Sequence, residues 1–219
     1  MNKTLLSLLF VAGLSAGSAH AASQIDPKTY SMQDGPNNGY GYNDQSYSGG
    51  NVSGWLSGGE GDLTNAAKGM QVGGGYHAWE PYVLWDGFSP VITFDLGANY
   101  AVSAIQAYFL YYPSAAVNIP TSANIRFSAD GVNFGTSLLR TFSSAEQTPG
   151  GDDTPASYNL LASAGSGRYV EVTLTTPGRW IALSEVEFYG TAAAVPEPET
   201  YALMLVGLGL VAFAARRRA

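Results

Sequence analysis

The sequence predicts an all-β protein: an antiparallel β-sandwich of the jelly-roll type, with an N-terminal signal peptide and a short C-terminal hydrophobic helix. Three observations support this fold class. Short windows of alternating apolar and polar residues recur in the middle of the chain, separated by turn residues. Only 12% of the residues are charged, too few for a coiled-coil or long-helix protein. The 219 residues suffice for one ordinary domain with terminal segments.

The first two strand windows lie side by side in the sequence. In residues 91–97, Ile92, Phe94 and Leu96 occupy every second position, which is typical of a half-buried strand. Residues 102–112 are apolar on both faces and rich in aromatic residues, which indicates a strand in the middle of a sandwich.

Three further windows complete the predicted sandwich. Residues 123–128 alternate and run into Asp130-Gly131, a hairpin-turn signal. Residues 168–175 alternate in the same way. In residues 183–190 the pattern directs Val186 and Phe188 inward and both glutamates outward.

Residues 22–59 are rich in glycine, tyrosine, asparagine and serine. Such a composition supports little regular structure. We therefore expect a long lead-in with one or two short strands before the sandwich, which we place at residues 60–190.

The N-terminus has the features of a secretory signal peptide. A positive start is followed by an apolar run over residues 5–14 and by Ala19-His20-Ala21. This order predicts a signal peptide over residues 1–21 that is cut after Ala21.

The C-terminus combines three features in order. Pro196-Glu197-Pro198 precedes an apolar stretch over residues 201–215, and Arg216, Arg217 and Arg218 follow it. Fifteen helical residues span about 22 Å, less than the roughly 30 Å hydrocarbon core of a bilayer, so a stable anchor is doubtful on length. The arginines favour a cytoplasmic C-terminus during a transient stage in the inner membrane.

Residues 195–219 resemble the PEP-CTERM sorting signal of Gram-negative bacteria. The resemblance implies an exosortase as partner, processing near Pro198, and delivery of the exported protein to the cell surface, the envelope or an extracellular matrix.

The charge balance narrows the class of partner. The chain has a net charge of −7 and no cysteine, so disulfides, thiol nucleophiles and cysteine metal sites are excluded. Nucleic acid is not expected, since phosphate binding needs clustered lysine and arginine. Residues 22–195 hold fifteen acidic and six basic residues, a net of −9, which favours divalent cations or neutral glycans over anionic polymers.

Six stretches between residues 60 and 190 resemble, in order, the discoidin-like (coagulation-factor C-type) domain. They are Leu63-Thr64-Asn65, Trp85-Asp86-Gly87 and residues 92–97, 128–134, 168–172 and 183–190. The resemblance implies a galactose-binding-like jelly roll. Members of this family are mostly non-catalytic and bind glycans, lipids or proteins through loops at one end.

The same resemblance implies a structural Ca²⁺. Its ligands would come from the loop with Asp62 and Asn65 and from the closing strand with the Ser184 carbonyl and Glu185. Asparagine at position 65, where the family usually has aspartate, brings an oxygen ligand but no charge. Alternatively, Glu185 and Glu187 form a solvated strand face, as alternation alone predicts, and the sequence leaves both interpretations open.

Aromatic residues crowd the segment before residue 91. Sugar rings stack on aromatic planes while nearby polar groups bind their hydroxyls. These properties make Tyr76, His77, Trp79, Glu80 and Trp85 candidates for ligand binding. Core packing is the alternative, and it is favoured for Trp85.

Catalysis finds little support in the sequence. After removal of the signal peptide His77 is the sole histidine, which excludes a zinc site built from histidines. A Ser-His-Asp triad would have to be built around this one residue. The loops also contain carboxylates, so a catalytic pair for glycoside hydrolysis is an open alternative. We therefore predict an exported non-catalytic module that binds a glycan or exopolysaccharide. The alternatives are a structural matrix protein without a specific ligand and a small polysaccharide-active enzyme.

Overall fold

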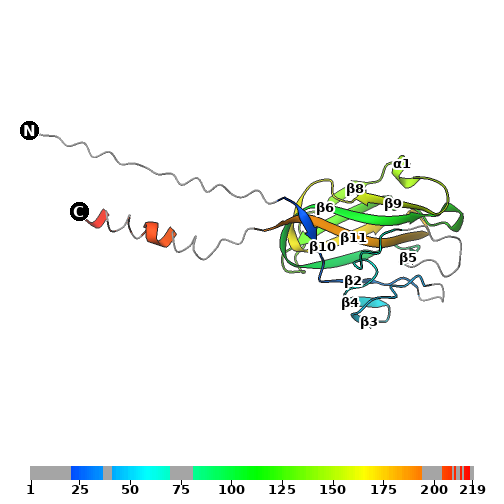
Figure 1. Cartoon of the computed structure of the whole chain (residues 1–219), viewed down its shortest axis with the longest axis horizontal. Helices are drawn as coiled ribbons and strands as arrows, with labels where there is room; N and C mark the ends of the chain where they lie inside the picture. The colour runs from blue at the N-terminus through cyan, green and yellow to red at the C-terminus, as the bar shows by residue number, and fades with distance from the viewer. Residues whose placement is uncertain are drawn as a thin grey trace, which may run out of the picture.

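Two layers of antiparallel strands form the body of the protein (Figure 1). A computed structural model describes residues 21–36, 41–69, 81–193, 204–208, 210, 213 and 215–217. The layers confirm the predicted antiparallel β-sandwich.

The strand β6 (Val91–Tyr111) belongs to both layers, which are otherwise built from different strands. The first layer has the order β3 (Gly50–Val52), β4 (Trp55–Gly59), β2 (Thr29–Gln33), β6, β10 (Gly165–Thr175), β7 (Ser122–Ser128) and β8 (Leu138–Thr141). In the second layer, β11 (Trp180–Ala192) pairs with β1 (Ser23–Ile25), β5 (Val83–Asp86) and β6, and β6 pairs with β9 (Thr154–Asn159). A 3₁₀ turn at Pro113–Ala115 and the single-turn helix α1 (Ser144–Gln147) complete the body.

The windows predicted at residues 91–97 and 102–112 are therefore one continuous strand. The first part of β6 pairs with β2, its second part pairs with β11 and β9, and β10 pairs along both parts. Gly97 lies between the parts with φ +81°, a conformation that favours glycine. Its amide donates to Asp95 Oδ1 at 2.7 Å.

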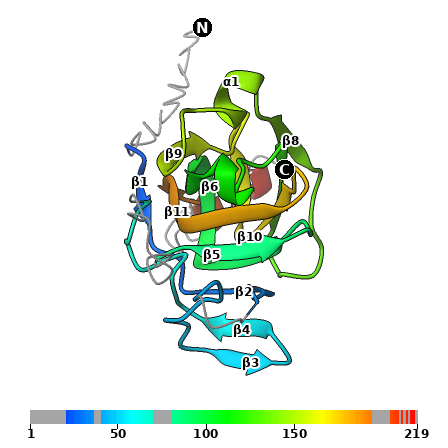
Figure 2. The same ribbon diagram turned by 90° about the vertical axis from the view of Figure 1, so that its right-hand side faces the viewer.

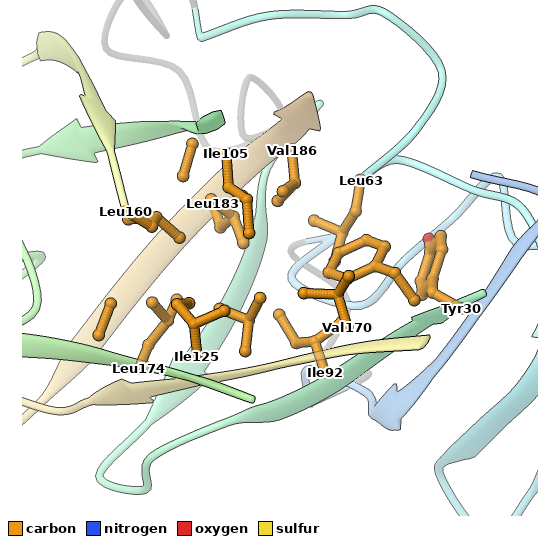
Figure 3. Close-up of a cluster of buried hydrophobic side chains, with 14 of the residues drawn as sticks. Tyr30, Leu63, Ile92, Ile105, Ile125, Leu160, Val170, Leu174, Leu183 and Val186 are labelled. Atoms are coloured by element: carbon orange, nitrogen blue, oxygen red, sulfur yellow. The ribbon is translucent and has the colours of Figure 1, made fainter. Parts of the chain in front are cut away.

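The core fills the space between the two layers (Figure 3). Ile105, Leu183 and Val186 of the second layer face Ile92, Ile125, Val170 and Leu174 of the first. Each is at most 1% exposed. The alternation read from residues 168–175 and 183–190 thus assigns the core faces of β10 and β11 correctly.

The segment predicted as a lead-in is part of the sandwich. Residues 22–59 contribute β1 to β4, and β2 lies between β4 and β6. Tyr30 and Met32 point inward from β2, and Leu56 points inward from β4. The glycines serve close packing: a Cβ on Gly49 would lie 2.5 Å from the amide nitrogen of Gly59. A composition typical of linkers here permits close approach of backbones.

Both tails leave the sandwich at the same end (Figure 1). Ser23 of β1 is paired with Gly190 of β11. The described residues between 204 and 216 are helical and exposed. Among the described residues, none belongs to a helix long and apolar enough to cross a membrane. The predicted signal peptide lies outside the described residues, except for exposed Ala21.

Candidate functional site

A hollow of about 640 Å³ opens at the end of the sandwich opposite the tails. Four elements meet there: the end of β2, the β3–β4 turn, the end of β5 and the start of β11. Figure 2 looks onto this end, with β5 across the front and β2, β4 and β3 below it. The volume lies within the range of small-molecule sites in proteins.

The lining combines apolar rings with polar groups. The rings are Phe88 and Trp180, the carboxylates are Asp34 and Asp86, and the amides are Gln33, Asn43 and Asn51. Binding sites of this kind use apolar surface for affinity and a few polar groups for orientation.

The end of β2 is fixed against the β3–β4 turn. Gly54 O accepts from the Asp34 amide at 2.8 Å and from Gln33 Nε2 at 2.9 Å. Gly54 has φ +80°, which this tight turn requires. Gly35, which follows Asp34 in the chain, has no room for a side chain, because a Cβ there would collide with the carbonyl oxygens of Tyr42 and Leu84. The wall of the hollow is therefore held by backbone contacts.

Arg179 holds the opposite wall. Its guanidinium donates to both oxygens of Asp86, with Nε–Oδ1 at 3.0 Å and Nη2–Oδ2 at 2.9 Å. It also lies 5.7 Å from the centre of the Trp180 ring. The Trp180 ring also lies edge-on to the Tyr42 ring, at 4.9 Å between centroids. These contacts fix the Trp180 ring at the hollow.

An exposed tryptophan neighbours the lining residues Gln33 and Gly54 without belonging to the lining itself. Trp55 of β4 is 48% exposed and is paired in register with Gln33. Since paired residues of antiparallel strands point to the same face, the indole lies on the same side as Gln33. Phe88 is 36% exposed. An indole is a large apolar group to expose on the surface of a protein, and its flat face can stack on the ring of a ligand.

Buried carboxylates stand behind the hollow. Asp34, Asp44 and Asp62 are each at most 7% exposed. Asp34 Oδ1 accepts from the amides of Gly35 and Asp44, both at 2.8 Å, and Asp44 Oδ1 accepts from the Asp62 amide at 3.0 Å. The Tyr30 hydroxyl donates to Asp44 Oδ2. Burial raises the pKa of Asp34, and it raises the pKa of Asp44 to about 6.

The loop and the closing strand expected to hold calcium are in contact. The Ala66 amide donates to Glu185 Oε2 at 2.9 Å. Glu185 is 4% exposed, and burial raises the pKa of its carboxyl group to about 8. Ser184 is fully buried, and its hydroxyl donates to Tyr108 O at 3.2 Å.

The side chains of Asp62 and Asn65 are engaged elsewhere. Asp62 accepts from the Gln45 amide at 3.0 Å, from the Ser46 hydroxyl, and from Asn65 Nδ2 at 3.2 Å. Asn65 Oδ1 accepts from the Ala67 amide at 2.8 Å. The described residues bring no three acidic or histidine side chains close enough to share an ion. A cation at Glu185 would therefore take most of its oxygens from backbone carbonyls.

Glu187 is a second buried carboxylate on β11, and three side chains donate to it. It is 3% exposed and accepts from Lys68 Nζ at 2.5 Å, from the Tyr108 hydroxyl at 2.8 Å and from the Tyr189 hydroxyl at 2.9 Å. Both glutamates point away from the core, but the loop that ends at Lys68 covers them. The alternative of a solvated strand face is therefore wrong, because alternation along a strand does not reveal what covers its outer side.

The aromatic candidates fall in two places. Tyr76, His77, Trp79 and Glu80 lie outside the described residues. Trp85 is 0% exposed, and its Nε1 donates to Gln33 O at 2.8 Å. It is a core residue with no surface for a sugar, which corrects its assignment as a ligand-binding residue. It supports the hollow indirectly by fixing the end of β2.

Sequence reasoning missed most of the hollow. Gln33, Asp34, Asn43 and Asn51 belong to the segment predicted as a lead-in, and Phe88 belongs to the β5–β6 connection.

Comparison with known proteins identifies the C-terminal segment. The model of the PEP-CTERM protein-sorting motif matches residues 194–218. This match confirms the sorting motif. Pro196, Glu197, Pro198 and Arg218 lie outside the described residues, whereas Arg216 and Arg217 are described and exposed. No curated protein matches the chain.

The body is similar in fold to solved carbohydrate-binding modules. The CBM32 module of AlyQ, in complex with 4,5-unsaturated mannuronic acid, shares 17% identity over 76% of this chain and 97% of that one, with a TM-score of 0.42. Chitosan-binding module 1 from a chitosanase/glucanase of Paenibacillus sp. IK-5 shares 15% over 77% and 99%, with a TM-score of 0.45. A fucose-binding module of Streptococcus pneumoniae shares 13% over 77% and 95%, with a TM-score of 0.43.

Proposed function

We propose that the protein is an exported, non-catalytic module that binds a glycan or exopolysaccharide at the cell surface or in the matrix. The observation that carries the proposal is the hollow lined by Phe88 and Trp180, with amides and carboxylates beside them. Apolar faces of sugars stack on such rings, and amide and carboxylate groups bind their hydroxyls.

The position of the hollow suits a surface protein. Trp180 at the start of β11 lines the hollow, and Gly190 near its end is paired with Ser23 beside both tails. Ten residues of strand span about 33 Å. The hollow therefore lies at the other end of the sandwich from the point where the chain continues toward the sorting motif, which leaves it open to a glycan while the motif is in a membrane.

The PEP-CTERM motif supports the location. In this proposal the motif enters the inner membrane transiently, the exposed Arg216 and Arg217 remain cytoplasmic, and an exosortase processes the chain near Pro198. The body is then released to the envelope or matrix. A Pro198→Ala variant should accumulate in the inner-membrane fraction.

A glycan array probed with the purified full chain tests binding. The proposal predicts retention on a restricted group of glycans, including the exopolysaccharide of the host. Absence of binding to every glycan, with the chain folded by circular dichroism, would favour a structural matrix protein without a specific ligand.

The second alternative is a small polysaccharide-active enzyme. Both oxygens of Asp86 are held by Arg179, and Asp34 Oδ1 accepts two backbone amides. These bonds favour structural roles over proton transfer. Release of reducing ends from a bound glycan, abolished by Asp34→Asn, would replace the binding proposal by an enzymatic one.

We also propose that Ca²⁺ binds at Glu185. The support is the buried carboxylate, whose raised pKa reflects burial, and the loop of residues 62–66 that lies against it. A bound cation would supply charge compensation and fix that loop to the closing strand. Calcium-dependent stability, argued in the Discussion, is the test.

A further inference from the structure

The net charge at the hollow is negative: two carboxylates line it, and Arg179, from outside the lining, balances one of them. The charged residues of its lining are Asp34 and Asp86, and the lining contains no lysine or arginine among the described residues. The amides Gln33, Asn43 and Asn51 are neutral. A ligand in this hollow therefore meets carboxylates, and an anionic sugar would meet repulsion.

The two carboxylates differ in how they are compensated. Asp86 is neutralised by its two contacts with Arg179. Asp34 takes part in none of the ion pairs formed by the described residues, and it is 7% exposed. Its hydrogen bonds come from the backbone amides of Gly35 and Asp44, which carry no full charge.

The charge behind Asp34 has the same sign. Asp44 and Asp62 are linked to it in a row, because Asp34 accepts from the Asp44 amide and Asp44 accepts from the Asp62 amide, and both are buried. Among the described residues, the other donors to these two carboxylates are hydroxyl and amide groups, such as the Tyr30 hydroxyl on Asp44 and the Gln45 amide on Asp62. Burial reduces screening by water and salt, so this row of carboxylates makes the wall of the hollow attractive to a cation.

The rings beside this wall add a second preference. Phe88 and Trp180 line the same hollow, and aromatic faces attract both the apolar faces of sugars and cationic groups. An ammonium group on a sugar ring satisfies the wall and the rings together.

We propose that the hollow selects glycans with free amino groups over neutral counterparts and over uronic-acid glycans. This inference rests on the proposed glycan-binding function and names its ligand class. The ammonium group lies against the wall that contains Asp34, and the sugar ring lies against Phe88 and Trp180.

The test uses two probes that differ only at the amino group. A pentamer of β-1,4-linked glucosamine and its fully N-acetylated form are titrated into the full chain by calorimetry, at a pH at which the amines are protonated and which lies above the raised pKa of Asp44, about 6. An oligouronate of the same length is the anionic probe. We expect the free-amine pentamer to bind at least about 10-fold more tightly than the acetylated one, and this advantage to shrink with added salt.

Variants assign the preference to the wall. Asp34→Asn keeps an acceptor for the amides of Gly35 and Asp44 and removes the charge, so the advantage of the free amine should be lost. Asp26→Asn removes an exposed charge outside the lining and should leave the advantage unchanged. Should Asp34→Asn fail to fold, the salt dependence and the oligouronate probe on the unmodified chain decide the question.

The outcomes separate this inference from the function beneath it. Equal binding of the two pentamers, or tighter binding of the oligouronate, overturns the charge preference while glycan binding stands. A chain that binds no glycan of any charge on the array overturns both.

Discussion

The carboxylate of Glu185 accepts a hydrogen bond from the backbone amide of Ala66, which lies 119 residues earlier in the chain, at 2.9 Å. Ala66 has φ +66°, the left-handed region that non-glycine residues rarely adopt. The contact fastens the loop that ends at Lys68 to the outer side of β11. Burial makes the ionised form of Glu185 costly, although backbone amides of Ala66 and Asn65 hydrogen-bond to the carboxylate.

The first prediction is that stability falls as the pH rises, because of Glu185. Burial raises the folded-state pKa of Glu185 from 4.5 to about 8, so folding favours the protonated form. The stabilisation is complete below the unfolded pKa and is lost as the pH rises through about 8. The difference between these two pKa values corresponds to about 5 kcal/mol. Glu185→Gln stays neutral and should melt above the unmodified chain at pH 9.

The control for this prediction is a difference measurement. The pKa of Asp44 is also raised, and Glu187 and Lys68 face Glu185, so the pH dependence of the unmodified chain contains other contributions. The difference in Tm between the chain and Glu185→Gln isolates Glu185. With millimolar Ca²⁺ the unmodified chain should instead gain Tm as the pH rises, and Glu185→Gln should not. A variant equally destabilised at every pH, with and without Ca²⁺, would contradict both expectations.

The second prediction concerns Glu187. Glu187→Gln removes the charge that pairs with Lys68 and weakens acceptance from Tyr108 and Tyr189. Because the carboxylate is buried, we expect the free energy of unfolding in urea to fall by about 2–3 kcal/mol. The matched control is Glu171→Gln, which breaks the pair with Arg126 on the more exposed face of the first layer. It should cost less than about 1 kcal/mol. Equal costs would show that the loop does not shield Glu187.

Alternation made the middle of the sandwich predictable and left its edges hidden. Val170 and Val172 of β10 face the core as their spacing indicates. β5, by contrast, buries Val83, Leu84 and Trp85 in succession, because both of its faces are covered. A strand without alternation carries no periodic signal. The strands β2 to β4 were not predicted for a different reason. Their region is rich in glycine, which is typical of linkers, but here the glycines allow close packing of backbones.

The site was less predictable than the fold. Glu185 and the loop of residues 62–66 were paired correctly only through a family resemblance, since nothing in their spacing brings together residues 119 positions apart. The hollow depends on three-dimensional adjacency of β2, β5 and β11, so its residues carry no local pattern. Trp85 is in the core, as the packing interpretation favoured for it predicts. It was also a ligand-binding candidate because a tryptophan near glycines has the same sequence signature whether it lines a site or fills a core.

The third prediction tests whether residues 22–59 belong to the domain. A chain that begins at residue 60 lacks β2, which covers Ile92 and Phe94 through its pairing with β6. It also loses buried Tyr30, Met32 and Leu56. Each large side chain contributes about 1.5–3 kcal/mol of burial, so this chain should not melt cooperatively. A chain that ends at residue 193 should keep its Tm, since the described tail residues are exposed. Cooperative melting of the chain that begins at residue 60 would show that residues 22–59 are a lead-in outside the domain.

The last prediction separates binding from folding at the rim. Phe88→Ala and Trp55→Ala each remove an exposed ring, at the hollow and beside Gln33 respectively. We expect glycan affinity to fall about 10-fold or more, because stacking on an aromatic face is lost, while Tm changes little. Leu139→Ala is the control: Leu139 is 62% exposed on β8, at the other edge of the first layer. It removes a comparable apolar side chain and should leave affinity unchanged.

Since Trp85 lies beneath the same surface, Trp85→Phe should lower Tm through the lost bond to Gln33 O and affect affinity only as far as the end of β2 moves. An affinity that follows Tm across all four variants would place the binding surface elsewhere on the molecule.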